Sequence, residues 1–182
     1  MHKRRRIMDA IAKLSAERGY EATTIADIVR SAGVARKTLY DNFEGKEDVF
    51  LAAFDEAVAE LFGQVEAACA AVEGSWPERV EAALEAFLRY FAERPAAAKM
   101  CMIEALAATP ASSRHYEETV ERFAALVREA GPDESGIPDT TAEILVGGVS
   151  WIVYQQIRRG ETERCLDLLP ELTEFVCAPY GR

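Results

Sequence analysis

The amino-acid sequence predicts an all-α protein, with a small N-terminal helical domain followed by a larger helical body. Ala, Glu, Leu and Arg dominate the 182 residues, whereas the β-branched alternation that marks strands is scarce. Apolar residues recur at three- and four-residue spacing, and Pro, Gly and capping residues divide them into about nine helices. The length suffices for one large or two small domains with a sizeable core.

A helix followed by a tight turn is predicted in the stretch 23–34. Thr24 is expected to be the N-cap of this helix, and Asp27, three residues later, to complete a capping box. Gly33 is expected to adopt the positive φ that ends the helix. A second helix should therefore follow at once.

That second helix is predicted to begin near Ala35 and to bury Leu39 and Phe43, which lie four residues apart. Apart from Asp41, its outward side chains are cations and hydrogen-bond donors, which suit a polyanion. A helix-turn-helix of this kind places its second helix in the major groove of DNA. We therefore expect DNA contacts from five residues of this helix: Arg36, Lys37, Thr38, Tyr40 and Asn42.

Charge is divided unevenly along the chain. The total is −10, but residues 1–46 carry 10 Lys and Arg against 6 Asp and Glu, a balance of +4. Such an asymmetry indicates two modules with different partners, one of which meets phosphates. We predict a DNA-binding domain over 1–46 and a separate helical body over 47–182.

The N-terminal third also contains an ordered and correctly spaced set of residues: Arg4–Arg6, Ile7, Ala10, Glu17–Tyr20, Thr23, Thr24, Ile28, Ala32–Val34, Thr38–Tyr40, Phe43 and Lys46. In this set the chain resembles the DNA-binding domain of the TetR family of bacterial transcriptional regulators. The body matches that family only in length and helical layout. Four positions depart from the pattern: Ser15 and Val29 in the packing, and Asp41 and Asn42 where phosphate contacts are expected.

The resemblance implies roles for individual residues. Backbone phosphates would be held by Thr24, Tyr40 and Lys46. Base edges would lie nearest to Arg36, Lys37 and Thr38. Asp41 would either point away from DNA or accept a hydrogen bond from a cytosine amino group. The run Lys3–Arg6 fits an arm in the minor groove and a solvated tail equally well.

The body is predicted to be a succession of helices with clear boundaries. Ser75 and Glu78 form a second capping box, which opens a helix ending near Glu93. Thr140 with Glu143 should cap a later helix in the same way. The other expected ranges are 46–72, 95–108, 109–130, 140–159 and 162–177, with a kink or a fresh start at Pro170.

The last two of these helices are candidates for self-association into a homodimer. Their apolar residues follow helical spacing, and Gly147 and Gly148 would permit a close approach. The alternative is that these faces pack within one monomer. A dimer would present two copies of the DNA-binding domain over 1–46, here called the head, to a palindromic site. The interface residues expected are Ile144, Leu145, Val149, Ile152, Leu166, Leu169, Leu172, Phe175 and Val176.

The resemblance further implies a small, largely hydrophobic effector that binds the body and releases a repressor from its operator. Aromatic and polar residues on the middle helices are the candidates for an effector pocket, and the alternative for each aromatic residue is a place in the core. The candidates are Phe87, Phe91, Met102, Glu104, Tyr116, Phe123, Trp151, Tyr154 and Gln155.

Other functional classes have less support in the sequence. Cys69, Cys101, Cys165 and Cys177 lack metal-ligand spacing, so they are expected to be small buried residues, with a thiol sensor as the alternative. Only two histidines occur, and neither a catalytic set nor a cofactor motif is visible, so we expect no enzyme, metal or cofactor. A helical interaction module without DNA binding remains the other alternative. No signal peptide or membrane span is recognisable, which predicts a cytoplasmic protein.

Overall fold

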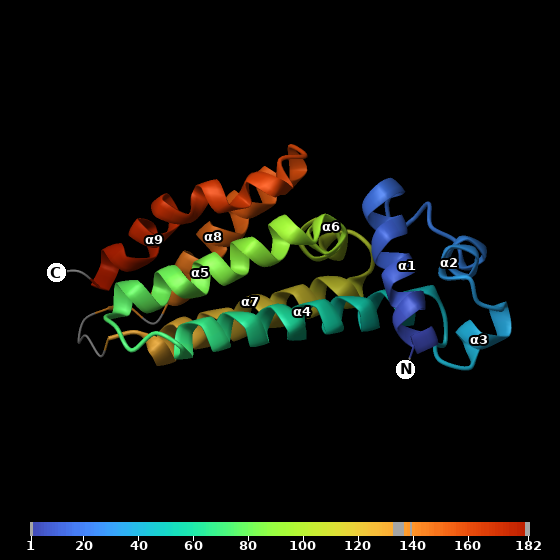
Figure 1. Ribbon diagram of the computed structural model, residues 1–182, viewed down its shortest axis with the longest axis horizontal. Helices are drawn as coiled ribbons and strands as arrows, with labels where there is room; N and C mark the ends of the chain where they lie inside the picture. Colours follow the sequence, from blue (N-terminus) through green and yellow to red (C-terminus); the bar gives the residue numbers. More distant parts are fainter. Residues whose placement is uncertain (1, 133–136, 139, 181–182) are drawn as a thin grey trace. The chain divides into compact units, whose positions relative to one another are not determined.

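The computed structural model describes residues 2–132, 137–138 and 140–180. Within these ranges the chain forms nine α-helices and three 3-10 helices and has no strand (Figure 1). The all-α fold class is therefore confirmed. The elements are α1 His2–Arg18, α2 Ile25–Ala32, α3 Arg36–Tyr40, α4 Lys46–Ala70, α5 Trp76–Glu93, α6 Pro95–Met102, η1 Glu104–Leu106, α7 Pro110–Ala130, α8 Thr141–Arg158, η2 Thr162–Leu168, α9 Leu169–Cys177 and η3 Ala178–Tyr180.

The chain forms two compact units. The first contains Met1–Ala59 and Arg94–Tyr116, and the second contains Glu60–Glu93 and Glu117–Arg182. Helices α4 and α7 each begin in the first unit and continue in the second. These units are defined by packing. The boundary that we predict at residue 46 divides the chain by function, between DNA binding and the helical body, and it stays a prediction.

In the first unit, α1 packs against both α2 and α6. Its core is formed by fully buried apolar residues of several helices, among them Ile7, Ile28 and Leu39. Ser15, a departure from the family pattern, is also buried, and its hydroxyl donates to the carbonyl of Ile11 at 2.6 Å. The polar group therefore has a partner inside the core.

In the second unit, α5 packs against α9 and η2, and α8 packs against the same two elements. Pro170 lies in the first turn of α9, directly after η2, so it marks a fresh start instead of a kink. A Cβ added to Gly148 would come within 2.9 Å of the Phe175 ring. Gly148 thus allows α9 to approach α8 closely.

Two sequence predictions about helix boundaries are wrong. The helix that begins at Pro95 ends at Met102, because Ile103 leaves regular helical geometry (φ −115°, ψ −60°) and a 3-10 turn follows. Thr140 does not cap α8 with its side chain, because its backbone is helical and not extended as an N-cap requires. Glu143 instead forms an ion pair with Arg128 of α7.

Two features are absent from the described residues. None of the helices there is both long and apolar enough to cross a membrane. No group of three or more His, Cys, Asp or Glu residues is arranged there to hold a metal ion.

Candidate nucleic-acid interface and effector cavity

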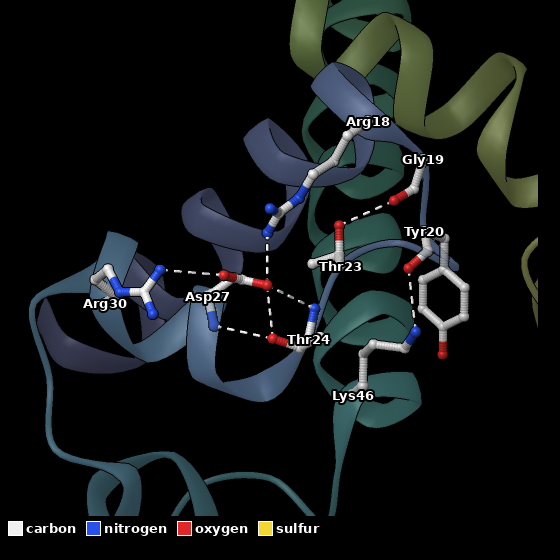
Figure 2. Close-up of polar contacts among 8 residues, drawn as sticks. All are labelled: Arg18, Gly19, Tyr20, Thr23, Thr24, Asp27, Arg30 and Lys46. Carbon is white, nitrogen blue, oxygen red and sulfur yellow. Dashed lines mark hydrogen bonds and ion pairs between the residues drawn. The ribbon is translucent and has the colours of Figure 1, made fainter.

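The start of α2 is fixed by a reciprocal capping box, as predicted. Thr24 has an extended backbone, and its hydroxyl accepts the backbone N–H of Asp27 at 3.2 Å (Figure 2). The Asp27 carboxylate in turn accepts the Thr24 N–H at 3.2 Å and its hydroxyl at 2.6 Å. Arg18 of α1 and Arg30 also pair with this carboxylate, at 2.8 and 3.3 Å. One side chain therefore ties α1 to the beginning of α2.

Replacing Thr24 by Ala is expected to lower the free energy of unfolding by about 1 kcal/mol, because α2 loses its cap. The Thr24 hydroxyl is the first cause of a lowered pKa of Asp27. A lowered folded-state pKa gives stability that is present above the ordinary aspartate pKa and is lost as the pH falls through the lowered value. The difference in the free energy of unfolding between Thr24→Ala and wild type should therefore become smaller at acid pH.

Denaturant titration at several pH values measures this effect. Ser31→Ala, an exposed change on the same helix, is the matched control and should leave stability nearly unchanged. Equal stability of Thr24→Ala and wild type near neutral pH would show that the cap contributes nothing.

The turn after α2 requires glycine. Gly33 has φ +61°. Its N–H donates to the Arg30 carbonyl at 3.2 Å, and the Val34 N–H donates to the Val29 carbonyl at 3.0 Å. The Arg6 guanidinium donates to the Gly33 carbonyl at 3.2 Å and lies where a side chain at Gly33 would collide with it. The left-handed conformation predicted from sequence is confirmed.

Helix α3 presents polar side chains outward, while Leu39 is fully buried beneath it. Arg36, Lys37 and Tyr40 are exposed, and Thr38 is half-buried. The Arg36 guanidinium lies 5.7 Å from the centre of the Tyr40 ring, and the Asn42 amide donates to the Thr38 carbonyl at 2.7 Å. Asp41, also exposed, ends the helix.

Tyr20 connects three parts of the first unit. Its carbonyl accepts a bond from the Lys46 ammonium at 3.1 Å, and that ammonium lies 3.9 Å from the centre of its ring (Figure 2). Its N–H donates to the Glu104 carboxylate at 2.7 Å. Lys46 therefore already holds the loop before α2, besides the phosphate contact predicted for it.

The basic run Lys3–Arg6 is neither a free tail nor an extended arm, because α1 begins at His2. Ile7 and Ile11, four residues apart, are fully buried and anchor the N-terminal half of α1 in the core. Arg4 lies over the Phe43 ring at 5.0 Å, and Arg5 pairs with Asp9 and Glu56. These cations are part of the folded head.

The second unit contains an apolar cavity of about 100 Å³. Its walls come from α4, α5, α7, α8 and α9, and they are formed largely by Val, Ala, Leu and Phe. Cys69, Trp76, Arg79 and Ser150 are the lining residues that carry polar side-chain atoms. Such a cavity suits a mainly hydrophobic ligand.

The predicted pocket residues are not brought together there. Phe87 and Phe123 line the cavity, with ring centres 5.8 Å apart. The remaining candidates are not among the lining residues: Phe91, Met102, Glu104, Tyr116, Trp151, Tyr154 and Gln155. Phe91 and Met102 are buried core, and Glu104 holds Tyr20. Sequence reasoning missed Trp76 and Arg79, although Trp76, Val80 and Phe87 follow helical spacing on one face of α5.

An apolar face of α8 and α9 is left uncovered in the single chain. Ile144, Trp151, Ile152 and Phe175 are 65, 57, 42 and 41% exposed. Gly147 lies among them with nothing within 4 Å of its added Cβ. Trp151 stacks on Tyr154, with ring centres 5.5 Å apart. Four residues predicted for a dimer interface are instead buried in the chain's own core: Leu145, Val149, Leu172 and Val176.

The cysteines differ in burial. Cys101 and Cys165 are buried, and burial is the main cause that raises the pKa of the Cys101 thiol to about 12 and that of Cys165 to about 11. Thiols with such pKa values remain protonated near neutral pH. Cys69 and Cys177 are half-buried. The structure therefore disfavours Cys165 as a thiol sensor.

Residues 7–53 match the family model for the bacterial regulatory proteins of the tetR family. The matched residues run from within α1, through the Gly33 turn and α3, into α4. The match identifies this N-terminal segment as the kind of domain found at the start of tetR-family regulators. The recognition made from sequence is confirmed.

Curated relatives match about a third of the chain. The chain is 35% identical over 60 residues to the fatty acid metabolism regulator protein of Bacillus subtilis (strain 168), covering 33% of this chain and 31% of that protein. It is 37% identical over 62 residues to the HTH-type transcriptional repressor KstR2 of Rhodococcus jostii (strain RHA1), covering 34 and 30%. The matched part of the chain thus spans about a third of the length of these curated relatives.

Solved structures match the fold of nearly the whole chain. The fatty acid degradation regulator FadR from Bacillus halodurans superposes with a TM-score of 0.88, covering 99% of this chain and 97% of that one at 18% identity. FadR from Bacillus subtilis in complex with stearoyl-CoA superposes with a TM-score of 0.82, covering 94% of this chain and 96% of that one at 19% identity. At such identities the likeness establishes the fold.

Proposed function

We propose that this chain is a sequence-specific DNA-binding transcriptional repressor, and not an enzyme, that acts as a homodimer and is released from its operator by a small hydrophobic effector. One observation carries the proposal. Helix α3 exposes Arg36, Lys37 and Tyr40 on a helix-turn-helix whose two helices are fixed by the Thr24 cap and the Gly33 turn. A recognition helix needs this combination of a donor-rich outer face and a rigid base.

The geometry of the head supports the roles that the family resemblance implies. Arg36, Lys37 and Thr38 are at the start of α3, the end that reaches base edges when such a helix enters the major groove. Thr24, Tyr40 and Lys46 would contact backbone phosphates. The Asn42 amide donates to the Thr38 carbonyl, so we assign it mainly to holding α3.

The exposed apolar face of α8 and α9 supports homodimer formation. Ile144, Trp151, Ile152 and Phe175 form a surface that a second copy would remove from water. The uncovered Gly147 would let the two α8 helices approach closely. A two-fold dimer matches a palindromic operator, because each head meets one half-site.

The apolar cavity supports effector control. Helices α4 and α7 contribute lining residues in the second unit and also extend into the first, which contains the head. An effector that binds the DNA-incompatible conformation 100-fold more tightly supplies about 2.7 kcal/mol of coupling. The stearoyl-CoA complex of the similar FadR makes molecules with an acyl chain the first effectors to test.

Selection of bound duplexes from a random DNA pool, at near-physiological salt, tests this function. We expect a palindrome with half-site centres about 34–36 Å apart or somewhat more. Effectors would then be assayed by release of the recovered duplex. Recovery of random sequences only, from folded protein, would contradict the proposal and favour an interaction module.

A further inference from the structure

We propose that Arg79 selects the effector by its head group, so that the cavity binds an apolar chain that ends in an anionic oxygen group. This inference rests on the proposed role of the cavity as the effector site. Arg79 lines the cavity from α5 and is the one charged residue in its described wall. Apart from Cys69, Trp76 and Ser150, the other lining residues are Val, Ala, Leu or Phe.

The Arg79 cation has no acidic partner among the described residues. Its side chain donates to the carbonyl of Gly74 at 3.0 Å, and no carboxylate in that part of the chain forms an ion pair with it. Arg89 and Arg128 of the second unit do have such partners, Glu85 and Glu143, whereas no ion pair is formed by Arg122, Arg158 or Arg159 among the described residues. Because guanidinium presents five donors, a single carbonyl leaves capacity for a ligand anion.

A second donor on the same wall lacks a partner. The indole Nε1 of Trp76 is buried and makes no hydrogen bond within the described residues. A buried indole N–H usually has an acceptor, and leaving one unpaired is costly. Trp76 is three residues before Arg79 on α5, so the two residues lie on one face of the helix and both line the cavity.

These observations define a chemical class. The apolar walls favour a hydrocarbon chain, and the unpaired cation favours an anion over a neutral or cationic head. Carboxylate and phosphate oxygens both accept from arginine in this way. The anionic group could belong to a free fatty acid or to an acyl thioester that carries phosphates, and the experiment separates these two sources.

Isothermal titration of the full-length chain without DNA tests the inference with four ligands that share a ten-carbon chain: decanoate, decanoyl-CoA, 1-decanol and decyltrimethylammonium. We expect wild type to bind decanoate, decanoyl-CoA or both at least about tenfold more tightly than decanol. Tight binding of decanoate identifies the free acid, and a preference for decanoyl-CoA identifies the thioester. The ammonium ligand should bind most weakly.

Substitutions then assign the preference to a residue. Arg79→Gln should remove at least about tenfold of the affinity for the anionic ligand and leave decanol within about twofold, which also shows that the variant folds. Arg79→Lys should retain part of the preference, because it keeps the charge and loses the planar fork. Arg89→Gln removes an exposed arginine of the same helix and should bind as wild type does.

Three results would overturn the inference: equal affinity for decanoate, decanoyl-CoA and decanol, an equal loss of all ligands in Arg79→Gln, or no binding of any of the four. Because no DNA is present, these outcomes are independent of repressor function. An anion preference that depends on Arg79, in a protein that selects no DNA sequence, would reject the proposed repressor and retain this site.

Discussion

Replacing both Arg36 and Lys37 by Ala is expected to weaken operator binding at least about 30-fold and to reduce sequence preference. Each good base contact contributes about 1–3 kcal/mol of discrimination, so the loss of two contacts per head is at least about 2 kcal/mol. Both side chains are exposed on α3, and neither supports the buried core that Leu39 anchors. Stability should therefore change little.

Fluorescence titration with the selected duplex and with a scrambled one measures this loss. The matched control is Arg89→Ala with Arg164→Ala, which removes two exposed cations outside the head. The control variant should keep most of the affinity for the selected duplex and all of the preference for it over the scrambled one. Full operator preference in the Arg36/Lys37 variant would mean that another surface reads the bases.

Replacing Ile144 and Trp151 by Glu is expected to convert the proposed homodimer into monomers, with its dissociation constant raised at least about 100-fold. The two side chains are 65 and 57% exposed in the single chain and would be buried by a second copy. An unpaired carboxylate in an apolar interface is strongly unfavourable. Operator binding should fall as well, because a monomer engages one half-site.

Analytical ultracentrifugation across protein concentrations gives the oligomeric state of the variant. Leu106→Glu is the matched control, because Leu106 is also an exposed apolar side chain, at 45%, but lies in η1. This control should remain dimeric. A dimer that persists in the Ile144/Trp151 variant with unchanged affinity would place the interface elsewhere.

The head could be predicted closely from sequence because its geometry is set by local interactions. The Thr24–Asp27 box acts over three residues, and the left-handed Gly33 follows from the conformational freedom of glycine. The burial of Leu39 and Phe43 follows from their four-residue spacing. Each of these features depends on residues close together in the chain.

The cavity could not be predicted because it depends on which face of each helix turns inward. Helix α8 is apolar on several sides, and packing places Val149 and Val153 inside while Trp151 and Ile152 remain outside. An aromatic residue alone does not reveal this choice. The bond of Glu104 to the Tyr20 N–H joins positions 84 residues apart, which local patterns do not encode.

The salt dependence of operator affinity tests the central claim most directly. Binding of the selected duplex by wild type, measured at several salt concentrations, should give a linear fall of log affinity with log salt. A slope of about −4 or steeper would correspond to two or more cations close to phosphates in each of two heads, Lys46 together with the basic residues of α3. Affinity that stays level as salt rises, or is equal for scrambled duplexes, would contradict a head that reads DNA through α3.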